Sequence, residues 1–473
     1  MRKGLIVLLA AVVAVAFAMP AMADLIPTNL NVSGFYRSKA WVSNFFGQSA
    51  LPTDNTEASS AFVEQRFRVK FAFGTENVQA VWFLESDMLW GDNAGSAPTA
   101  SSRNSGGALG GDKVQTETKN IYLWFKVPDT SVDVTVGLQG QSDDYAGFLY
   151  GGADMAGIFV KGKFEPVSYK FGLAKLYENA TQKTDDRTLY VAEVKFVPVK
   201  EVKVGANFYF LQDDANRPDT GATLTNGLTG FAAPILPYAY NAKVYMPGVS
   251  AAFKAGPATI SGFAQYQFGE LAATSSASPD IDVNAYLLDL RADLNVGPGK
   301  LFFEGLYTSG GDRATATEDY EAPITLATNE ASPGGNSAYS RTNMTILLPS
   351  PDTINISQCL IGCSGGAAGA DPGNRGRGIW HIAAGYSQAL TPKLKGQVNV
   401  GYLSATEMLA SDISTKSEDM GTEFNARLDY NLAKGLDVGV AGAYALIGDF
   451  FNNAAGQTPE DVWAGYARVN YAF

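Results

Sequence analysis

The feature that most constrains the fold of this chain is a strict alternation of short and long connections between segments of period-two hydrophobicity. The short connections contain the Gly, Pro, Asp or Asn that tight reversals require, and they fall at 74–77, 128–131, 165–168, 198–201, 255–258, 297–300, 391–393 and 433–435. The long connections are rich in Gly, Ser, Ala, Asn and Asp, and they fall at about 47–60, 92–116, 142–156, 178–186, 213–237, 270–280, 310–376, 406–418 and 450–460. Eight short turns and nine long loops separate eighteen strands, with sixteen as the alternative count. This rhythm predicts that all turns lie at one end of an antiparallel sheet and all loops at the other.

The two faces of the expected strands differ sharply in chemistry. In residues 64–73, "EQRFRVKFAF", positions 64, 66, 68 and 70 are charged and most of the positions between them are apolar. Residues 202–210 and 421–432 also separate an apolar set from a more polar set with period two. A soluble barrel fills its interior with apolar side chains, whereas here the polar face carries many charges. We therefore expect lipid outside and water inside, which requires a closed sheet because backbone groups in lipid must be paired. The predicted fold class is all-β, a transmembrane antiparallel β-barrel.

The beginning of the chain predicts export. A basic start is followed by an apolar run that ends in a small-x-small triplet at residues 21–23. This pattern is typical of a cleaved secretory signal peptide, here residues 1–23, which directs a protein through the Sec pathway. Residues 24–473 then form a single barrel domain.

Composition excludes several classes of function. The whole chain carries a net charge of −12, and loss of the two basic residues of the signal peptide makes it −14. An acidic balance argues against nucleic acid and favours a modest preference for cations. The chain has one histidine, His381, with no nucleophile motif near it, so we expect no enzymatic activity.

Neither a cofactor nor a metal centre is expected. Residues 106–112 and 213–221 resemble cation-binding loops only weakly, and flexible surface loops need the same residues, so loop-bound calcium is the sole candidate. The two cysteines, Cys359 and Cys363, lack a supporting histidine, and in an exported protein a small disulfide loop is the better interpretation than two free thiols.

Four stretches of this chain resemble the outer-membrane porins of Gram-negative bacteria: "LNVSGFYRSKAWV" (30–42), "FLESDMLWGD" (83–92), "VDVTVGLQGQSDDYAG" (132–147) and the terminal "YARVNYAF" (466–473). The resemblance implies that the short turns are periplasmic and the long loops external. It implies that Tyr471 and Phe473 form the signal read by the outer-membrane assembly machinery, and that the protein is a homotrimer in contact with outer-membrane lipid and lipopolysaccharide.

The same resemblance implies a third loop, at about 141–157, that folds inward and narrows the pore. The acidic residues expected at this constriction are Asp143, Asp144 and Asp154. Charges of the pore wall would face them, with the basic candidates Arg66, Arg68, Lys70, Lys161 and Lys163, and the acidic candidates Glu85 and Asp87. Opposed charges would create a transverse field across a narrow aqueous passage, which aligns polar solutes and disfavours apolar ones.

The function expected from these features is that of an outer-membrane porin, a water-filled channel for passive diffusion of ions and small hydrophilic solutes. The alternative is a substrate-specific channel for a sugar, an amino acid or a carboxylate. Two further interpretations are less favoured. One is a barrel that sheathes an electron conduit, and the other is an outer-membrane enzyme. The long loop at about 310–376 is expected to be external, where it would serve adhesion or phage binding or shield the mouth.

Overall fold

The computed structural model describes residues 29–45, 59–92, 106–178, 185–214, 228–229, 240–273, 279–312, 318–326, 339, 341–349, 372–410, 412, 414–453 and 456–473. The predicted signal peptide and both cysteines, Cys359 and Cys363, lie outside these residues.

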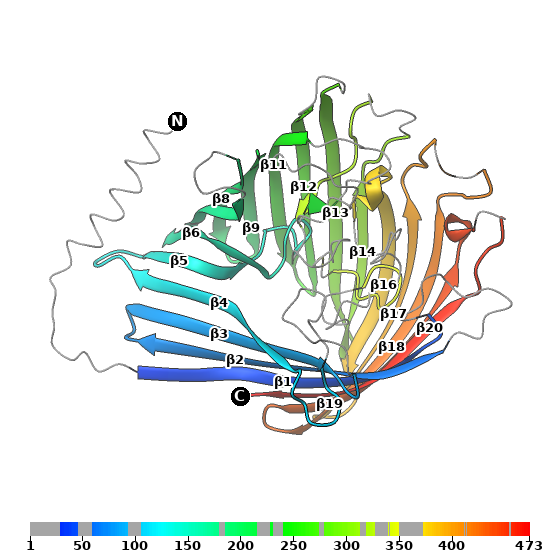
Figure 1. Cartoon of the computed structure of the whole chain (residues 1–473), viewed down its shortest axis with the longest axis horizontal. Coiled ribbons are helices and arrows are strands. Elements are labelled where there is room, and N and C mark those ends of the chain that lie inside the picture. The colour runs from blue at the N-terminus through cyan, green and yellow to red at the C-terminus, as the bar shows by residue number, and fades with distance from the viewer. Residues whose placement is uncertain are drawn as a thin grey trace.

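One sheet of eighteen strands dominates the structure (Figure 1). Its first nine strands are β1 (Asn29–Ser43), β2 (Ser60–Gly74), β3 (Val78–Leu89), β4 (Gln115–Lys126), β5 (Val132–Gln141), β6 (Ala153–Phe164), β7 (Val167–Glu178), β8 (Asp186–Val199) and β9 (Val202–Asp213). The remaining nine are β11 (Tyr240–Ala255), β12 (Ala258–Ala273), β13 (Ile281–Val296), β14 (Gly299–Thr308), β16 (Ile379–Ala389), β17 (Leu394–Ala405), β18 (Asp419–Ala433), β19 (Leu436–Ile447) and β20 (Val462–Ala472).

The sheet closes on itself. Each strand pairs antiparallel with the next along the chain, including β9 with β11 and β14 with β16 across the two longest gaps. The ring is completed by β1, which pairs antiparallel with β20, so the blue first strand runs beside the red last strand in Figure 1. The predicted eighteen-stranded antiparallel barrel is confirmed.

Small elements lie in the long loops. The two-residue strands β10 (Leu228–Thr229) and β15 (Thr325–Leu326) pair with each other and so join the loop after β9 to the loop after β14. Among the described residues, the short 3-10 helix η2 (Asn374–Gly376) precedes β16, and a second one, η3 (Asp449–Phe451), follows β19.

Among the described residues, no helix is both long and apolar enough to cross a membrane.

The outward face of the barrel is apolar on strands all around the ring. On β13, Leu288 and Leu290 are 55% and 59% exposed, while Asp289 between them is 1% exposed because it points into the barrel. The same contrast recurs elsewhere, with exposed outward residues that include Phe67, Val136, Phe171, Phe208, Ile260, Phe303, Val398, Phe424 and Val440. Soluble monomers rarely expose contiguous apolar surface of this extent, so the outer face is suited to hydrocarbon.

The seam between the first and last strands depends on Gly34 and Phe473. The amide of Gly34 donates to the carbonyl of Phe473 at 2.9 Å, and the amide of Phe473 donates back at 3.0 Å. A Cβ at Gly34 would lie 2.1 Å from the carbonyl oxygen of Arg68 and 3.0 Å from the Phe473 ring. The ring of Phe473 also stacks on Phe67 of β2, with centroids 6.2 Å apart. A side chain at Gly34 would therefore push β1 away from both neighbours.

We predict that Gly34→Ala destabilises the barrel by about 1–3 kcal/mol, the usual cost of overpacking. The measurement is the folded fraction in detergent micelles as guanidinium is raised. The control is Gly442→Ala on β19, where an added Cβ meets no atom within 4 Å. Equal stability of the two variants would contradict the close approach at the seam.

Candidate functional site

The inner wall formed by β2 and β3 carries paired charges. Arg66 and Arg68 of β2 lie directly opposite Asp87 and Glu85 of β3 in the strand register. The Arg66 guanidinium donates to Asp87 Oδ1 at 2.7 Å and to Asp87 Oδ2 at 2.5 Å, and it lies 3.5 Å from Glu85 Oε1. Arg68 Nε donates to the other oxygen of Glu85. The repulsion between cations two residues apart is thus offset by carboxylates on the adjacent strand.

These two arginines retain contact with solvent. Their side chains are 13% and 20% exposed, while Glu85 is only 1% exposed. Lys70, two residues further along the inner face of β2, is also partly exposed. The guanidinium groups therefore cover the carboxylates and present positive charge toward the barrel interior.

Further arginines that the sequence did not single out extend this wall. Arg37 of β1 pairs in register with Arg66, and on the other side Arg468 of β20 donates to Asp429 at 2.8 Å. Arg427 of β18 forms an ion pair with the same Asp429 at 2.7 Å. Their positions on the polar face of alternating segments were the signal that could have identified them.

The loop between β5 and β6, residues 142–152, lies against the inner wall. Its Asp143 carboxylate accepts four backbone N–H groups of the loop itself, from Tyr145, Gly147, Leu149 and Tyr150, at 2.5–2.9 Å. Burial raises the pKa of Asp143 to about 6, and the four N–H donors act in the opposite direction by stabilising the ionised form. Asp143 thus stabilises the shape of the loop, and its expected role at the constriction stays a prediction.

The other two acids expected at the constriction also have nearby partners. Asp144 accepts a hydrogen bond from Ser250 of β11 at 2.6 Å and forms an ion pair with Lys195 of β8. Asp154 belongs to strand β6, not to the loop as expected, because the strand begins at Ala153. It bonds to Lys119 and Asn120 of β4, at 2.7 Å each.

None of these three acids makes an ion pair with the described Arg66, Arg68 or Lys70, which have partners or neighbours on β3 instead. The field that opposed charges would create across the lumen therefore stays a prediction. The other basic candidates lie nearer to the turn end of the barrel. Lys163 pairs at 2.8 Å with Glu165 in the β6–β7 turn, and both side chains are more than half exposed. Lys161 faces Lys170 and Asp133 in register.

Part of the long loop after β14 is inside the barrel, which corrects the expectation of an external loop for residues 324–326, 339 and 341–349. The inward-facing Glu423 of β18 accepts the amides of Thr345, Ile346 and Leu347 at 2.6, 2.8 and 2.9 Å. Gln267 of β12 binds both backbone groups of Ile324, at 2.8 and 3.1 Å. Polar wall residues pair these backbone groups, which explains why the segment can be buried.

A second anchor of this loop is a charged cluster on β13, β14 and β16. The Tyr339 hydroxyl makes short hydrogen bonds to Asp289 and Glu304, and Arg341 donates to Asp289 at 2.6 Å. His381 lies 3.5 Å from Glu304 and is 1% exposed. This single histidine therefore supports the wall beneath the loop.

The two inward loops also share an apolar core. Tyr145 and Phe148 of the first loop pack on Phe263 of β12, with ring centroids 5.1 and 6.4 Å apart, and Phe148 packs edge-on against Tyr339 at 6.1 Å. The amide of Leu326 donates to the carbonyl of Leu149 at 2.8 Å. The loops thus pack on each other and on β12. We call Arg66 and Arg68, with their carboxylate partners on β3, the arginine wall.

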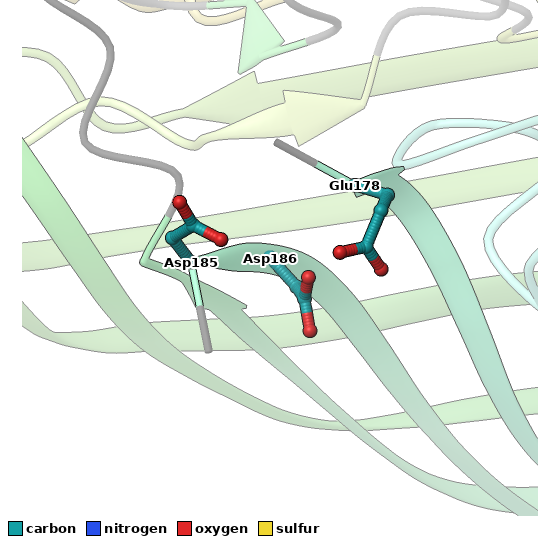
Figure 2. Close-up of side chains that lie close together, drawn as sticks. All are labelled: Glu178, Asp185 and Asp186. Atoms are coloured by element: carbon teal, nitrogen blue, oxygen red, sulfur yellow. The ribbon is translucent and has the colours of Figure 1, made fainter. Parts of the chain in front are cut away.

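A group of three carboxylates lies at the loop end of β7 and β8. Figure 2 shows Glu178, Asp185 and Asp186 close together, with ligand oxygens within 4.8 Å of one another. The Lys175 ammonium lies 2.7 Å from Glu178 and 2.5 Å from Asp186, so two of the three carboxylates already have a cationic partner. We assign no metal to this group. Of the two ranges weighed for calcium, 106–112 is described and most of 213–221 is not.

Tyr471 and Phe473 lie on the lipid side of the seam, each 43% exposed, with ring centroids 5.8 Å apart. Their role as an assembly signal stays a prediction.

We predict that Glu423→Ala loosens the inner part of the long loop, because the amides of residues 345–347 lose their shared acceptor. Loss of buried hydrogen bonds of this kind costs about 1–3 kcal/mol, which corresponds to roughly ten- to hundredfold faster local hydrogen exchange. Exchange of these three amides, followed by mass spectrometry, is the measurement. Glu407→Ala, at an exposed position, is the control, and unchanged protection in Glu423→Ala would refute the anchor.

Comparison with known proteins relates this architecture to a group of solved barrels. No family model and no curated protein matches the chain. The outer membrane protein OpdK of Pseudomonas aeruginosa is similar over 94% of this chain and 98% of its own, with a TM-score of 0.52 and 11% identity. OccAB4 of Acinetobacter baumannii covers 95% of this chain and 100% of its own, with a TM-score of 0.54 and 10% identity. The shared feature is the fold.

Another similar structure is OccK2 (OpdF) of Pseudomonas aeruginosa in complex with glucuronate, with a TM-score of 0.53, 10% identity, and coverage of 94% of this chain and 98% of that one.

Proposed function

We propose that this protein is an outer-membrane porin, which lets ions and small hydrophilic solutes diffuse passively through a water-filled barrel. One observation carries the proposal: an apolar outer belt encloses an inner wall whose Arg66, Arg68 and Lys70 are partly exposed. Charged side chains on the inner face of a membrane-spanning strand can be solvated only by water in the lumen.

The two inward loops support a narrowed passage. They contact the inner wall on β8, β11, β12, β13 and β18, where their polar and aromatic partners lie. The remaining path runs along the arginine wall of β1–β3, where ion pairs present oriented charge to passing solutes. Such a path favours hydrophilic solutes, since an apolar molecule would displace water bound to these charges.

The proposal extends to the cellular setting. We propose export through the Sec pathway with a cleaved signal peptide, insertion by the outer-membrane assembly machinery, and a homotrimer in contact with lipopolysaccharide. We also propose a modest cation preference, which the net charge of the chain favours. Transport, not catalysis, is the role that the interior supports, since the single histidine is buried in the wall.

A second candidate is a channel specific for carboxylates. The observation that favours it is a group of arginines on the inward faces of β18, β20, β1 and β2, since guanidinium groups match carboxylate geometry. These are Arg37, Arg66, Arg68, Arg427 and Arg468. Glucuronate, bound by one protein of the same fold, is a carboxylate.

We predict stepwise conductance when the purified protein is added to a planar lipid bilayer in KCl. Absence of any conductance from correctly folded protein would contradict the porin proposal. The same measurement separates the two candidates. A general channel conducts with little change when glucuronate is added, whereas block by glucuronate but not by the neutral sugar glucose would favour the carboxylate-specific channel.

We predict that Arg66→Gln combined with Arg68→Gln shifts the reversal potential in a KCl gradient toward greater cation preference. Removal of both guanidinium groups leaves the carboxylates of Glu85 and Asp87 uncompensated at the wall. The matched control removes a whole ion pair, Arg66→Gln with Asp87→Asn, and should shift the potential less. An unchanged potential in the first variant would remove these arginines from the conducting path.

A further inference from the structure

A belt of lysines lines the turn end of the inner wall. It runs over neighbouring strands from β4 to β11 and consists of Lys126, Lys161, Lys163, Lys170, Lys195, Lys203 and Lys254. We call this set the lysine belt. All its members lie in the half of each strand that is nearer to a short turn.

The strand register shows that these side chains share the inner face. Lys161 of β6 lies opposite Lys170 of β7, and Lys195 of β8 lies opposite Gly205 of β9. Lys203 lies opposite Ala252 of β11, two residues before Lys254 on the same face. At the other end of the belt, Asp133 of β5 lies opposite both Lys126 and Lys161. Neighbouring strands are about 4.8 Å apart, so these lysines lie close to one another along the inner face, with Asp133 and Glu193 among them.

Acidic partners offset only part of this charge. Lys170 pairs with Glu193 at 2.5 Å, Lys195 pairs with Asp144, and Lys163 pairs with Glu165. In the described part of the chain, no carboxylate lies within ion-pair distance of the other four, Lys126, Lys161, Lys203 and Lys254. All four are exposed to solvent.

The acidic side chains nearest in sequence to Lys203 and Lys254 do not offset the positive charge of these two lysines. Glu201, in the β8–β9 turn, accepts the Lys254 amide at 2.8 Å through its backbone carbonyl, while its carboxylate lies 3.6 Å from Lys200. Asp129 occupies the β4–β5 turn at the far end of the belt. The contrast with the arginine wall is direct, because there each of Arg66 and Arg68 contacts a carboxylate.

We propose that the lysine belt is a binding site for polyvalent oxyanions at the turn end of the lumen. Ammonium groups on adjacent strands can bind separate charged oxygens of one molecule, which a monovalent ion cannot exploit. Lysine acts here as a point charge whose N–H groups can donate to phosphate or carboxylate oxygens in many orientations. The inference rests on the proposed function for the route by which a solute reaches the lumen.

The test uses the full-length mature protein in detergent, with sodium tripolyphosphate as the probe and isothermal titration calorimetry at about 0.1 M KCl, where the Debye length is about 10 Å. Saturable binding is expected, and Lys203→Gln combined with Lys254→Gln should weaken it about tenfold, because a focused field raises local ion concentration by at least that factor. Citrate, titrated in parallel, distinguishes a phosphate site from one that accepts carboxylates too; binding of either polyanion supports the proposal.

The matched control is Lys393→Gln combined with Lys434→Gln. It makes the same change of charge at the same end of the barrel, in turns outside the belt, and should leave binding unchanged. No binding of either probe by the wild type, or equal loss in the two double variants, would overturn the proposal.

The calorimetric result is independent of conductance, so the two proposals can fail separately. A barrel that conducts ions but binds neither probe would refute the lysine belt alone. A barrel that binds tripolyphosphate through Lys203 and Lys254 but conducts nothing would refute the porin alone. In a conducting barrel, tripolyphosphate added at the turn side should block at lower concentration than when added at the loop side, and the reverse order would count against the belt.

Discussion

Every backbone N–H and C=O group that faces lipid must find a partner within the protein, and the rest of this structure depends on that constraint. A sheet meets it only by closing, which is why β1 pairs with β20 and why Phe473 exchanges two hydrogen bonds with Gly34. Closure then divides the side chains into two sets with opposite solvents. The apolar set faces outward, and charges that would be costly in hydrocarbon are collected inside.

Inside the barrel, the same constraint acts on the loops. A loop segment buried in the lumen also has to pair its backbone, and here single carboxylates supply several acceptor contacts at once. Asp143 receives four amides of its own loop, and Glu423 receives three amides of a segment far away in the sequence. These two carboxylates pair backbone N–H groups of the loops, as the hydrogen bonds between strands pair those of the wall. They therefore help to determine the shape of the lumen.

The barrel could be predicted from sequence because its signals are local and repeated. Alternation with period two sets the faces, and the rhythm of turns and loops sets the strand count, so Phe67 and Arg66 could be assigned to opposite faces without a structure. The ion-pair partners of charged residues were harder to predict from the sequence. Whether Arg66 meets Asp87 depends on strand register, and Asp154 was placed in the wrong element because the loop ends earlier than its composition indicates. The inward course of residues 341–349 depends on Glu423, some seventy-five residues later in the chain, and no local pattern records such a contact.

The seam has a topological consequence. Asn29 lies opposite Gly74, at the turn end of the barrel, and Phe473 lies at the same end beside Gly34. The first and last described residues therefore lie at the same end of the barrel, although β1 extends five residues beyond Gly34, the partner of Phe473. In the ring of hydrogen bonds the break between β20 and β1 is not structurally special. A linker across it, with a new opening at any other turn, would leave every strand with the same two neighbours, so the fold is defined by a cyclic order of strands and not by its starting point.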